Sequence, residues 1–217
     1  MSGHGHGHGH GHGHDPKSYD ALGNPEDLAA YLSKLESPER AEWQRPDDVV
    51  RALGLRPGNV VCDVGAGPGY FALRIAREVG PEGRVYAIDA EPRMLALLLD
   101  RAADSHIQNV LTVPSPDGAA LPPERCHRIL IVNAFHHFPG ADYLGMLADQ
   151  LLPGGRLVNI DFQGGELPVG PPPDHKVSRE DFLRSAASVG LELVEEHTFL
   201  PYQYLLELAR PEGENPA

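Results

Sequence analysis

The sequence predicts an α/β domain, and three observations support this prediction. Short apolar strands alternate with helix-length segments between residues 60 and 161, which is the pattern of βαβ units. The length of 217 residues suits one domain with one substantial core. Only Leu200 and Pro201 separate the last two predicted strands, so these strands can form an antiparallel hairpin, because parallel neighbours require a long crossover.

The chain begins with a Gly-His repeat. Residues 3–14 repeat this dipeptide six times, and such a low-complexity tract cannot bury apolar surface, so we expect residues 1–17 to be disordered. Its six imidazoles can bind a divalent metal such as Ni²⁺, Zn²⁺ or Cu²⁺. An affinity tag would have the same composition, and we therefore predict no catalytic metal from this tract.

Residues 18–56 are predicted to form an N-terminal helical cap. The sequence at 24–27 is a helix start, and the segment at 46–48 opens a second helix that ends near Gly54. The connection between the two helices carries Trp43, the only tryptophan of the chain. Two interpretations of Trp43 stay open: an anchor that packs the helices together, or part of a lid over a bound ligand.

The later elements follow from apolar runs and the residues that bound them. The helix after the first strand stops at Gly80 and Pro81, and the fifth strand follows a turn at 153–155. Strands are predicted at 60–64, 84–89, 110–113, 128–133, 155–161, 191–199 and 202–209, and helices at 68–79, 91–102, 140–151 and 178–189.

A glycine-rich turn is the most informative motif of the chain. The predicted strand at 60–64 runs into glycines at every second position of 65–69, which lets a ligand approach main-chain N–H groups. Twenty residues later, the next strand ends in Asp89, whose carboxylate can hold a ribose diol. A dinucleotide site requires a further glycine where this chain has Tyr70, so NAD and FAD are disfavoured.

The acidic-x-Gly-x-Gly-x-Gly spacing of 63–69 resembles motif I of the class I S-adenosylmethionine-dependent methyltransferases, and Asp89 matches the acidic residue of their second motif. The resemblance covers about residues 46–209 and looks closest to small-molecule methyltransferases of type 11, which are related to quinone-biosynthesis enzymes. It implies a Rossmann-like three-layer α/β/α sandwich at 57–210. The implied sheet is seven-stranded and mostly parallel, with the antiparallel hairpin at its C-terminal end.

The resemblance also implies which residues hold S-adenosyl-L-methionine. The glycine turn and Asp63 would surround the methionine moiety, Asp89 would hold the ribose, and Asp117 would lie beside the adenine. An ordinary Asp-Gly turn is an equally open interpretation of Asp117. The expected cofactor-binding residues are Asp63, Gly65, Ala66, Gly67, Gly69, Asp89, Ala90, Asp117, Gly118 and Asn133.

The segment after the fourth strand carries the candidate catalytic residues His136 and His137 and resembles motif IV of the family. Methyl transfer from a sulfonium needs mainly alignment and exclusion of water. If the acceptor is a hydroxyl or an ammonium, a neutral histidine can remove its proton. The alternative is that one histidine fixes the loop and the other is exposed. The proline-rich segment 164–175 has two open interpretations: it is a rigid connector, or it shapes the acceptor pocket with His175 as a further candidate base.

Composition restricts the partners. Eighteen Lys and Arg residues against 31 Asp and Glu residues give a net charge of −13, without a basic cluster, so we expect a small-molecule acceptor and no nucleic acid. The chain contains no apolar run of membrane-spanning length and no secretory signal, so we expect a cytoplasmic protein without a membrane span. Cys62 and Cys126 are expected to be reduced thiols rather than a disulfide.

The sequence therefore predicts an S-adenosylmethionine-dependent methyltransferase with an unidentified acceptor. Two alternatives stay open. An NAD(P)-dependent oxidoreductase would use the same fold but should show the G-x-G-x-x-G motif. A metal-handling protein would act through the Gly-His repeat of residues 3–14.

Overall fold

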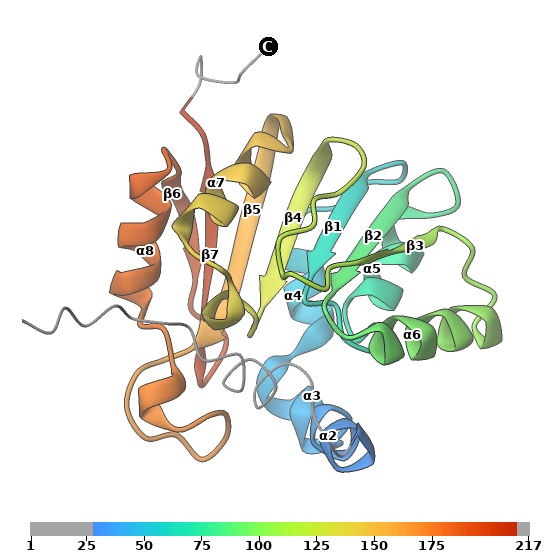
Figure 1. Cartoon of the computed structure of the whole chain (residues 1–217), viewed down its shortest axis with the longest axis horizontal. Helices are drawn as coiled ribbons and strands as arrows, with labels where there is room; N and C mark the ends of the chain where they lie inside the picture. Colours follow the sequence, from blue (N-terminus) through green and yellow to red (C-terminus); the bar gives the residue numbers. More distant parts are fainter. Residues whose placement is uncertain (1–27, 212–217) are drawn as a thin grey trace, which may run out of the picture.

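The structure, a computed structural model, describes residues 28–211 (Figure 1). The Gly-His repeat, with its predicted disorder and metal binding, lies outside the described residues, as does the predicted helix start at 24–27. Within the described part, no helix is both long and apolar enough to cross a membrane.

Helices and strands alternate through most of the described chain. The helices are α2 (Leu28–Leu35), α3 (Glu39–Gln44), α4 (Pro46–Ala52), α5 (Ala72–Val79), α6 (Pro92–Asp104), α7 (Ala141–Asp149) and α8 (Arg179–Ser188), with short 3-10 helices η1 (Phe135–His137) and η2 (Pro173–His175). The strands are β1 (Val60–Val64), β2 (Arg84–Asp89), β3 (Val110–Pro114), β4 (Cys126–Val132), β5 (Leu151–Phe162), β6 (Glu192–His197) and β7 (Gln203–Ala209).

The strands form one seven-stranded sheet in the order β3-β2-β1-β4-β5-β7-β6. Neighbouring strands from β3 to β5 are parallel, whereas β7 pairs antiparallel with both β5 and β6. The predicted α/β fold is confirmed, and so is the C-terminal hairpin. In this hairpin β7 lies inside the sheet and β6 lies at its edge.

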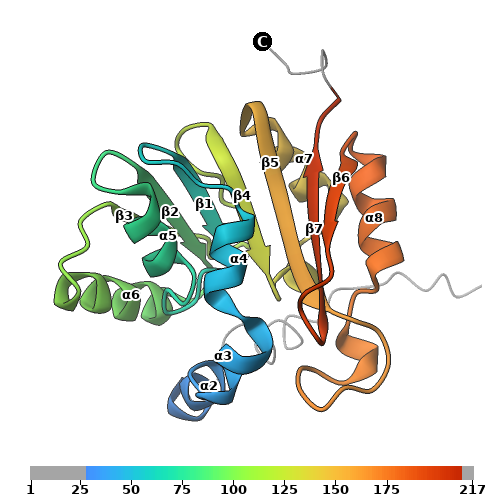
Figure 2. The ribbon, with the colours of Figure 1, turned by 180° about the vertical axis from the view of Figure 1, so that it is seen from behind.

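Helices cover both faces of the sheet because side chains alternate along each strand. In β1, Val61 packs into the core formed with α4 and α5, whereas Cys62 and Val64 pack into the core formed with α7 and α8. Figure 1 shows α7 and α8 in front of the sheet, and Figure 2 shows α4 and α5 on the opposite face. Cys62 and Cys126 are buried free thiols, as predicted.

Most predicted boundaries differ from the structure by one or two residues, and three differences are larger. Helix α5 begins at Ala72 rather than residue 68, because the glycine turn continues through Gly69, which has a φ of +89°. Strand β5 begins at Leu151 rather than residue 155, because Leu151 already pairs with Cys126 before an irregularity in the ladder.

The third difference lies before the sheet, where two helices are predicted. The described residues there form three helices, because Arg45 adopts a left-handed conformation with φ of +46° and separates α3 from α4. Trp43, expected in a connection, therefore lies within α3.

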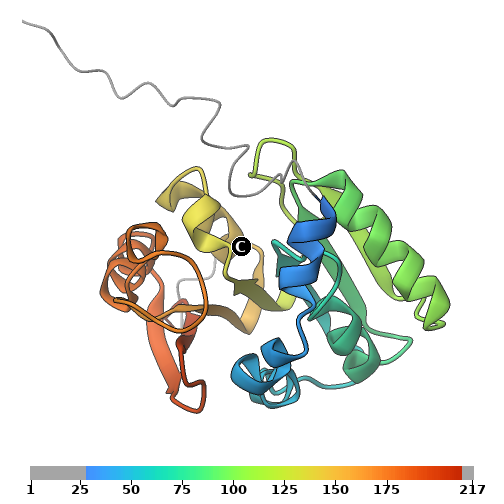
Figure 3. The same cartoon turned by 90° about the horizontal axis from the view of Figure 1, so that it is seen from below.

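The carboxyl ends of the parallel strands meet at one edge of the sheet, which is where open α/β sheets bind ligands. Figure 1 shows α2, α3 and the 163–178 segment at this edge. Figure 3 looks onto it, with α2 beside α6 and the 163–178 segment beside α8. An ion pair between Glu36 and Arg101 ties the end of α2 to α6.

Candidate active site

One pocket, here called the strand-end pocket, lies at the carboxyl ends of β1, β2 and β4. It brings together most of the predicted cofactor residues and one of the two predicted catalytic histidines. Its lining includes Asp63, Gly65, Ala66, Gly67, Asp89, Ala90, Gly118, Asn133 and His137, together with Leu35, Arg40, Tyr70, Met94 and Ser115. Gly69, Asp117 and His136 are not part of this lining.

The glycine turn forms one wall of the strand-end pocket, and a different local constraint explains the glycine at each position. A Cβ on Gly65 would lie 2.5 Å from the Ala134 Cβ, so Gly65 permits close approach to the loop after β4. Gly67 has a φ of +54° and nothing within 4 Å of an added Cβ. A Cβ on Gly69 would lie 2.9 Å from Leu98 Cγ of α6, so Gly69 serves helix packing rather than the pocket.

Asp89 links the glycine turn to the end of β2. Its Oδ2 accepts a hydrogen bond from the Gly67 N–H at 2.7 Å, and its Oδ1 accepts one from the Glu91 N–H at 2.9 Å. Each carboxylate oxygen has two lone pairs, so both oxygens keep acceptor capacity for ligand hydroxyl groups. Burial raises the pKa of Asp89, and the hydrogen bonds from Glu91 and Gly67 oppose this effect.

Asp63 is a buried carboxyl group with a free oxygen. The residue is 2% exposed, and Oδ2 has no hydrogen-bond partner among the described residues. Burial and the nearby charge of Asp89 raise the pKa of Asp63 to about 7. A buried polar atom without a partner is uncommon and calls for an explanation. A cationic ligand group next to Asp63 would satisfy this oxygen and favour the ionised form.

A chain of hydrogen-bonded side chains connects α3 to the loop after β4. Arg40 Nε donates to Gln44 Oε1 at 2.5 Å, and Gln44 Nε2 donates to Gln203 Oε1 at 3.3 Å. Gln203 Nε2 then donates to Asn133 Oδ1 at 2.7 Å. Asn133 has a φ of +53°, and the Arg40 guanidinium lies 3.9 Å from the centre of the Tyr70 ring. The sequence prediction includes only Asn133 from this chain.

The loop after β3 contributes Gly118 and Ser115 to the lining, whereas Asp117 is not part of the lining and forms a hydrogen bond within its own loop. Asp117 Oδ1 accepts from the Ala119 N–H at 3.2 Å, which is the Asp-Gly turn geometry left open by the sequence. Ser115 is 2% exposed, and its Oγ accepts from the Ala120 N–H at 2.9 Å. Ser115 is not among the predicted residues, because a single serine in a turn carries no sequence signal.

The two predicted catalytic histidines lie on η1 with their ring centres 4.0 Å apart. His137 lines the strand-end pocket, and burial together with the neighbouring His136 lowers the pKa of His137 to about 4. His136 lies behind it, with Nδ1 at 3.7 Å from Asp161 Oδ2 at the end of β5. Asp161 is buried and is absent from the sequence prediction, which placed this residue only as the last position of a strand.

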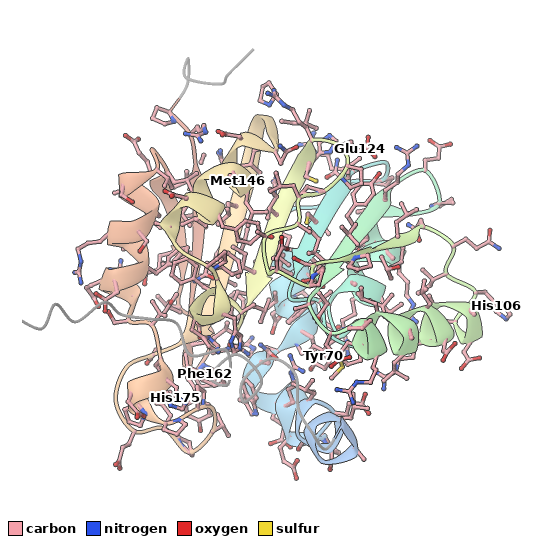
Figure 4. All side chains as sticks on the ribbon, in the orientation of Figure 1. Tyr70, His106, Glu124, Met146, Phe162 and His175 are labelled. Atoms are coloured by element: carbon pink, nitrogen blue, oxygen red, sulfur yellow. The ribbon has the colours of Figure 1, made fainter. Side chains whose placement is uncertain are left out.

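The proline-rich segment packs over the end of β5. A Cβ on Gly170 would lie 2.7 Å from the Phe162 ring, so this segment contacts Phe162 closely. On the other side, the Trp43 ring of α3 lies 5.5 Å from the Phe162 ring. His175 is exposed and is not part of the pocket lining. Figure 4 shows Tyr70, Phe162 and His175 at the same edge of the molecule, away from Glu124 and Met146.

Within residues 28–211, one group of side chains has metal-ligand spacing: Glu195, His197 and Glu207, whose ligand atoms lie within 4.8 Å of one another. This group lies on the β6–β7 hairpin and not in the lining of the strand-end pocket. His197 Nε2 and Glu207 Oε1 form a hydrogen bond of 2.9 Å, so each of these two atoms already has a partner within the group.

Residues 61–155 match the family described as "Methyltransferase domain". The chain is 32% identical over 126 residues to a protein-L-isoaspartate O-methyltransferase of Aeropyrum pernix, covering 57% of this chain and 44% of the relative. It is 31% identical over 123 residues to a ubiquinone/menaquinone biosynthesis C-methyltransferase of Ectopseudomonas mendocina, covering 55% of this chain and 47% of the relative. The chain thus spans less than half the length of these curated relatives.

A solved structure extends the similarity beyond the matched domain. The crystal structure of an S-adenosylmethionine-dependent methyltransferase from Aquifex aeolicus aligns with a TM-score of 0.76 and 25% identity, covering 82% of this chain and 96% of that chain. These comparisons support neither the nicotinamide-dependent oxidoreductase nor the metal-handling protein considered from the sequence.

Proposed function

We propose that this chain, a member of the class I S-adenosylmethionine-dependent methyltransferases, binds S-adenosyl-L-methionine in the strand-end pocket and transfers its methyl group to a small molecule. One observation carries this proposal: a buried carboxyl oxygen of Asp63, the open backbone of Gly67 and the carboxylate of Asp89 all border the same pocket.

These residues fit the chemical parts of the proposed cofactor. The unpartnered Asp63 Oδ2 fits an ammonium group, since a buried carboxylate is stabilised by an adjacent positive charge. The remaining acceptor capacity of Asp89 fits the two ribose hydroxyls. Met94 and Ser115 border the remaining part of the pocket, where an adenine ring would pack against the Met94 side chain.

When bound, S-adenosyl-L-methionine supplies a methyl group that is already activated by its sulfonium. The protein then has to align the acceptor with this methyl group and keep water away. In this chain, Leu35 and Arg40 of the N-terminal helices border the pocket from the cap side, and Asn133 and His137 border it from the loop after β4. The cap and this loop are held together by the hydrogen-bonded chain through Gln44 and Gln203.

Charge supports a small-molecule acceptor over a nucleic acid. The net charge of −13 repels phosphate backbones, and nucleic-acid binding requires Lys and Arg side chains that neutralise phosphates. The two curated relatives act in different contexts, since one is a protein-L-isoaspartate O-methyltransferase and the other a C-methyltransferase of ubiquinone/menaquinone biosynthesis. These relatives therefore do not identify the acceptor of this chain.

Titration calorimetry of the full chain with S-adenosyl-L-methionine tests the proposal. We expect binding, and we expect Asp89→Ala to weaken it by about 1.5–3 kcal/mol, because hydrogen bonds to a charged carboxylate are lost. Asp100→Ala is the matched control, since Asp100 is an exposed carboxylate on α6 outside the pocket lining. Binding of NAD with no heat from S-adenosyl-L-methionine would contradict the proposal.

A further inference from the structure

Two buried polar atoms face each other beside the strand-end pocket. Asp161 is 1% exposed, and its Oδ2 has no hydrogen-bond partner within residues 28–211, while Oδ1 accepts from the Phe162 N–H at 2.8 Å. His136 Nδ1 is also buried without a partner in the described part of the chain. The two unpartnered atoms are 3.7 Å apart, so a small movement of either side chain would join them in a hydrogen bond.

The other polar groups near this pair have their own partners or are neutral. The Tyr204 hydroxyl of β7 donates to the Val177 carbonyl at 3.2 Å and accepts from Asn159 Nδ2 at 3.4 Å. Burial and the charge of Asp161 raise the pKa of Tyr204, so Tyr204 stays protonated. On η1, His137 is neutral above its pKa of about 4.

More distant charges come from α8. Asp181 and Glu180 contribute to raising the pKa of Tyr204. Asp161 is therefore the acidic group that directly faces His136.

The position of His136 relates the pair to the pocket. Its neighbours on both sides, Asn133–Ala134 and His137–Phe138, line the strand-end pocket. Packing of the Phe135 ring on the Phe182 ring, with centres 4.8 Å apart, fixes η1 against α8. His136 itself does not line the pocket, but its side chain is 16% exposed, and since Nδ1 is buried and faces Asp161, the opposite nitrogen Nε2 is the one that can meet another molecule.

We infer that Asp161 positions His136 as a proton acceptor and that the methyl acceptor presents a hydroxyl group to His136 Nε2. This inference rests on the proposed methyl transfer. A buried carboxylate that accepts a hydrogen bond from Nδ1–H fixes the tautomer in which Nε2 carries a lone pair, and it stabilises the imidazolium that forms.

The step balances in atoms and charge. The hydroxyl oxygen of the acceptor forms a bond to the methyl carbon as the S–CH3 bond breaks, and the sulfur keeps the electron pair of that bond. The O–H bond breaks, and its proton goes to His136 Nε2. The products are a methyl ether, S-adenosylhomocysteine and an imidazolium next to Asp161. A hydroxyl needs such a base because its oxygen is a poor nucleophile while it carries the proton.

The test compares wild type, His136→Gln, Asp161→Asn and the control Asp104→Asn, which changes an exposed carboxylate at the end of α6. Methyl-labelled S-adenosyl-L-methionine is offered with a set of phenols and a matched set of anilines. We expect the label to appear in phenols. Turnover should fall by about 10²-fold or more in His136→Gln, which is the size of typical general-base effects. The affinity for the cofactor should be the same in all four proteins.

Two readouts separate positioning from a structural role. Nitrogen NMR should show the Nδ1–H tautomer of His136 in wild type and its loss in Asp161→Asn, because an amide N–H favours the opposite tautomer. The fall in turnover of Asp161→Asn should appear in kcat and not in KM for the cofactor.

Several results would overturn the inference. These are an absence of label in every phenol, full turnover in His136→Gln, or the same tautomer in wild type and Asp161→Asn. If the wild-type protein did not bind S-adenosyl-L-methionine, that result would instead refute the proposed function itself.

Discussion

At the residue scale, we predict that Asp63 makes cofactor binding in the strand-end pocket depend on pH. The pKa of Asp63 is raised to about 7 by burial and by the charge of Asp89. A cationic ligand binds the ionised carboxylate, so binding in this pocket releases a proton when the pH is below that pKa. We expect cofactor affinity to be nearly constant above about pH 8 and to fall by up to about tenfold per pH unit below about pH 6.

Calorimetry across this pH range, in buffers with different ionisation enthalpies, measures both the affinity and the proton release. Asp63→Asn should bind more weakly and should lose the proton release at low pH, because the amide does not titrate. Proton release that persists in Asp63→Asn would show that another group is responsible.

A second prediction at the residue scale concerns Gly65 and Gly67. Both have positive φ, so an alanine at either position is strained by about 1 kcal/mol or more. Only at Gly65 does the added Cβ also meet Ala134, at 2.5 Å, and such overpacking adds about 1–3 kcal/mol. In chemical denaturation we expect Gly65→Ala to lose more stability than Gly67→Ala. Equal losses would mean that the loop after β4 moves away without resistance.

At the scale of elements, the chain of Gln44, Gln203 and Asn133 joins α3, β7 and the loop after β4. Gln203→Leu removes both hydrogen bonds and leaves Nε2 of the buried Gln44 and Oδ1 of the half-buried Asn133 without these partners. Leaving a buried polar group unsatisfied costs about 1–3 kcal/mol. We expect a lower melting temperature and weaker cofactor binding, because Asn133 borders the pocket. Gln108→Leu is the control, since Gln108 is exposed in the loop before β3.

The element order could be predicted well, because apolar runs and glycine or proline boundaries are local signals. The hairpin is an example, since the two residues Leu200 and Pro201 exclude a parallel crossover. The start of β5 could not be predicted in the same way. Leu151 becomes part of the strand only by pairing with Cys126, a contact between distant segments that the residues around Leu151 do not reveal.

For the candidate site, the residues with a motif could be predicted and the others could not. Asp89 is recognisable from its spacing after the glycine turn. Asp161 and Gln203 look like ordinary strand residues in the sequence. Asp161 reaches η1 because β5 runs parallel to β4. Gln203 reaches the loop after β4 because β7 pairs antiparallel with β5, which places the start of β7 at the carboxyl ends of β4 and β5.

At the scale of the whole molecule, two segments cover the sheet edge at which the pocket lies, and only the first of them lines the pocket. The N-terminal helices α2 and α3 contribute Leu35 and Arg40 to its lining. The 163–178 segment packs on Phe162, which in turn contacts Trp43 of α3. We proposed a small-molecule acceptor above, and the charge of −13 is consistent with this proposal because it disfavours nucleic acids.

The proposal that this chain transfers a methyl group to a small molecule can be tested by following a labelled methyl group. The full chain is incubated with methyl-labelled S-adenosyl-L-methionine and a cell extract, and the label is then followed in the small-molecule, protein and nucleic-acid fractions. We predict label in the small-molecule fraction, formation of one S-adenosylhomocysteine per methyl group transferred, and a large loss of both products in Asp89→Ala. Label confined to protein or nucleic acid, or no S-adenosylhomocysteine at all, would contradict the account.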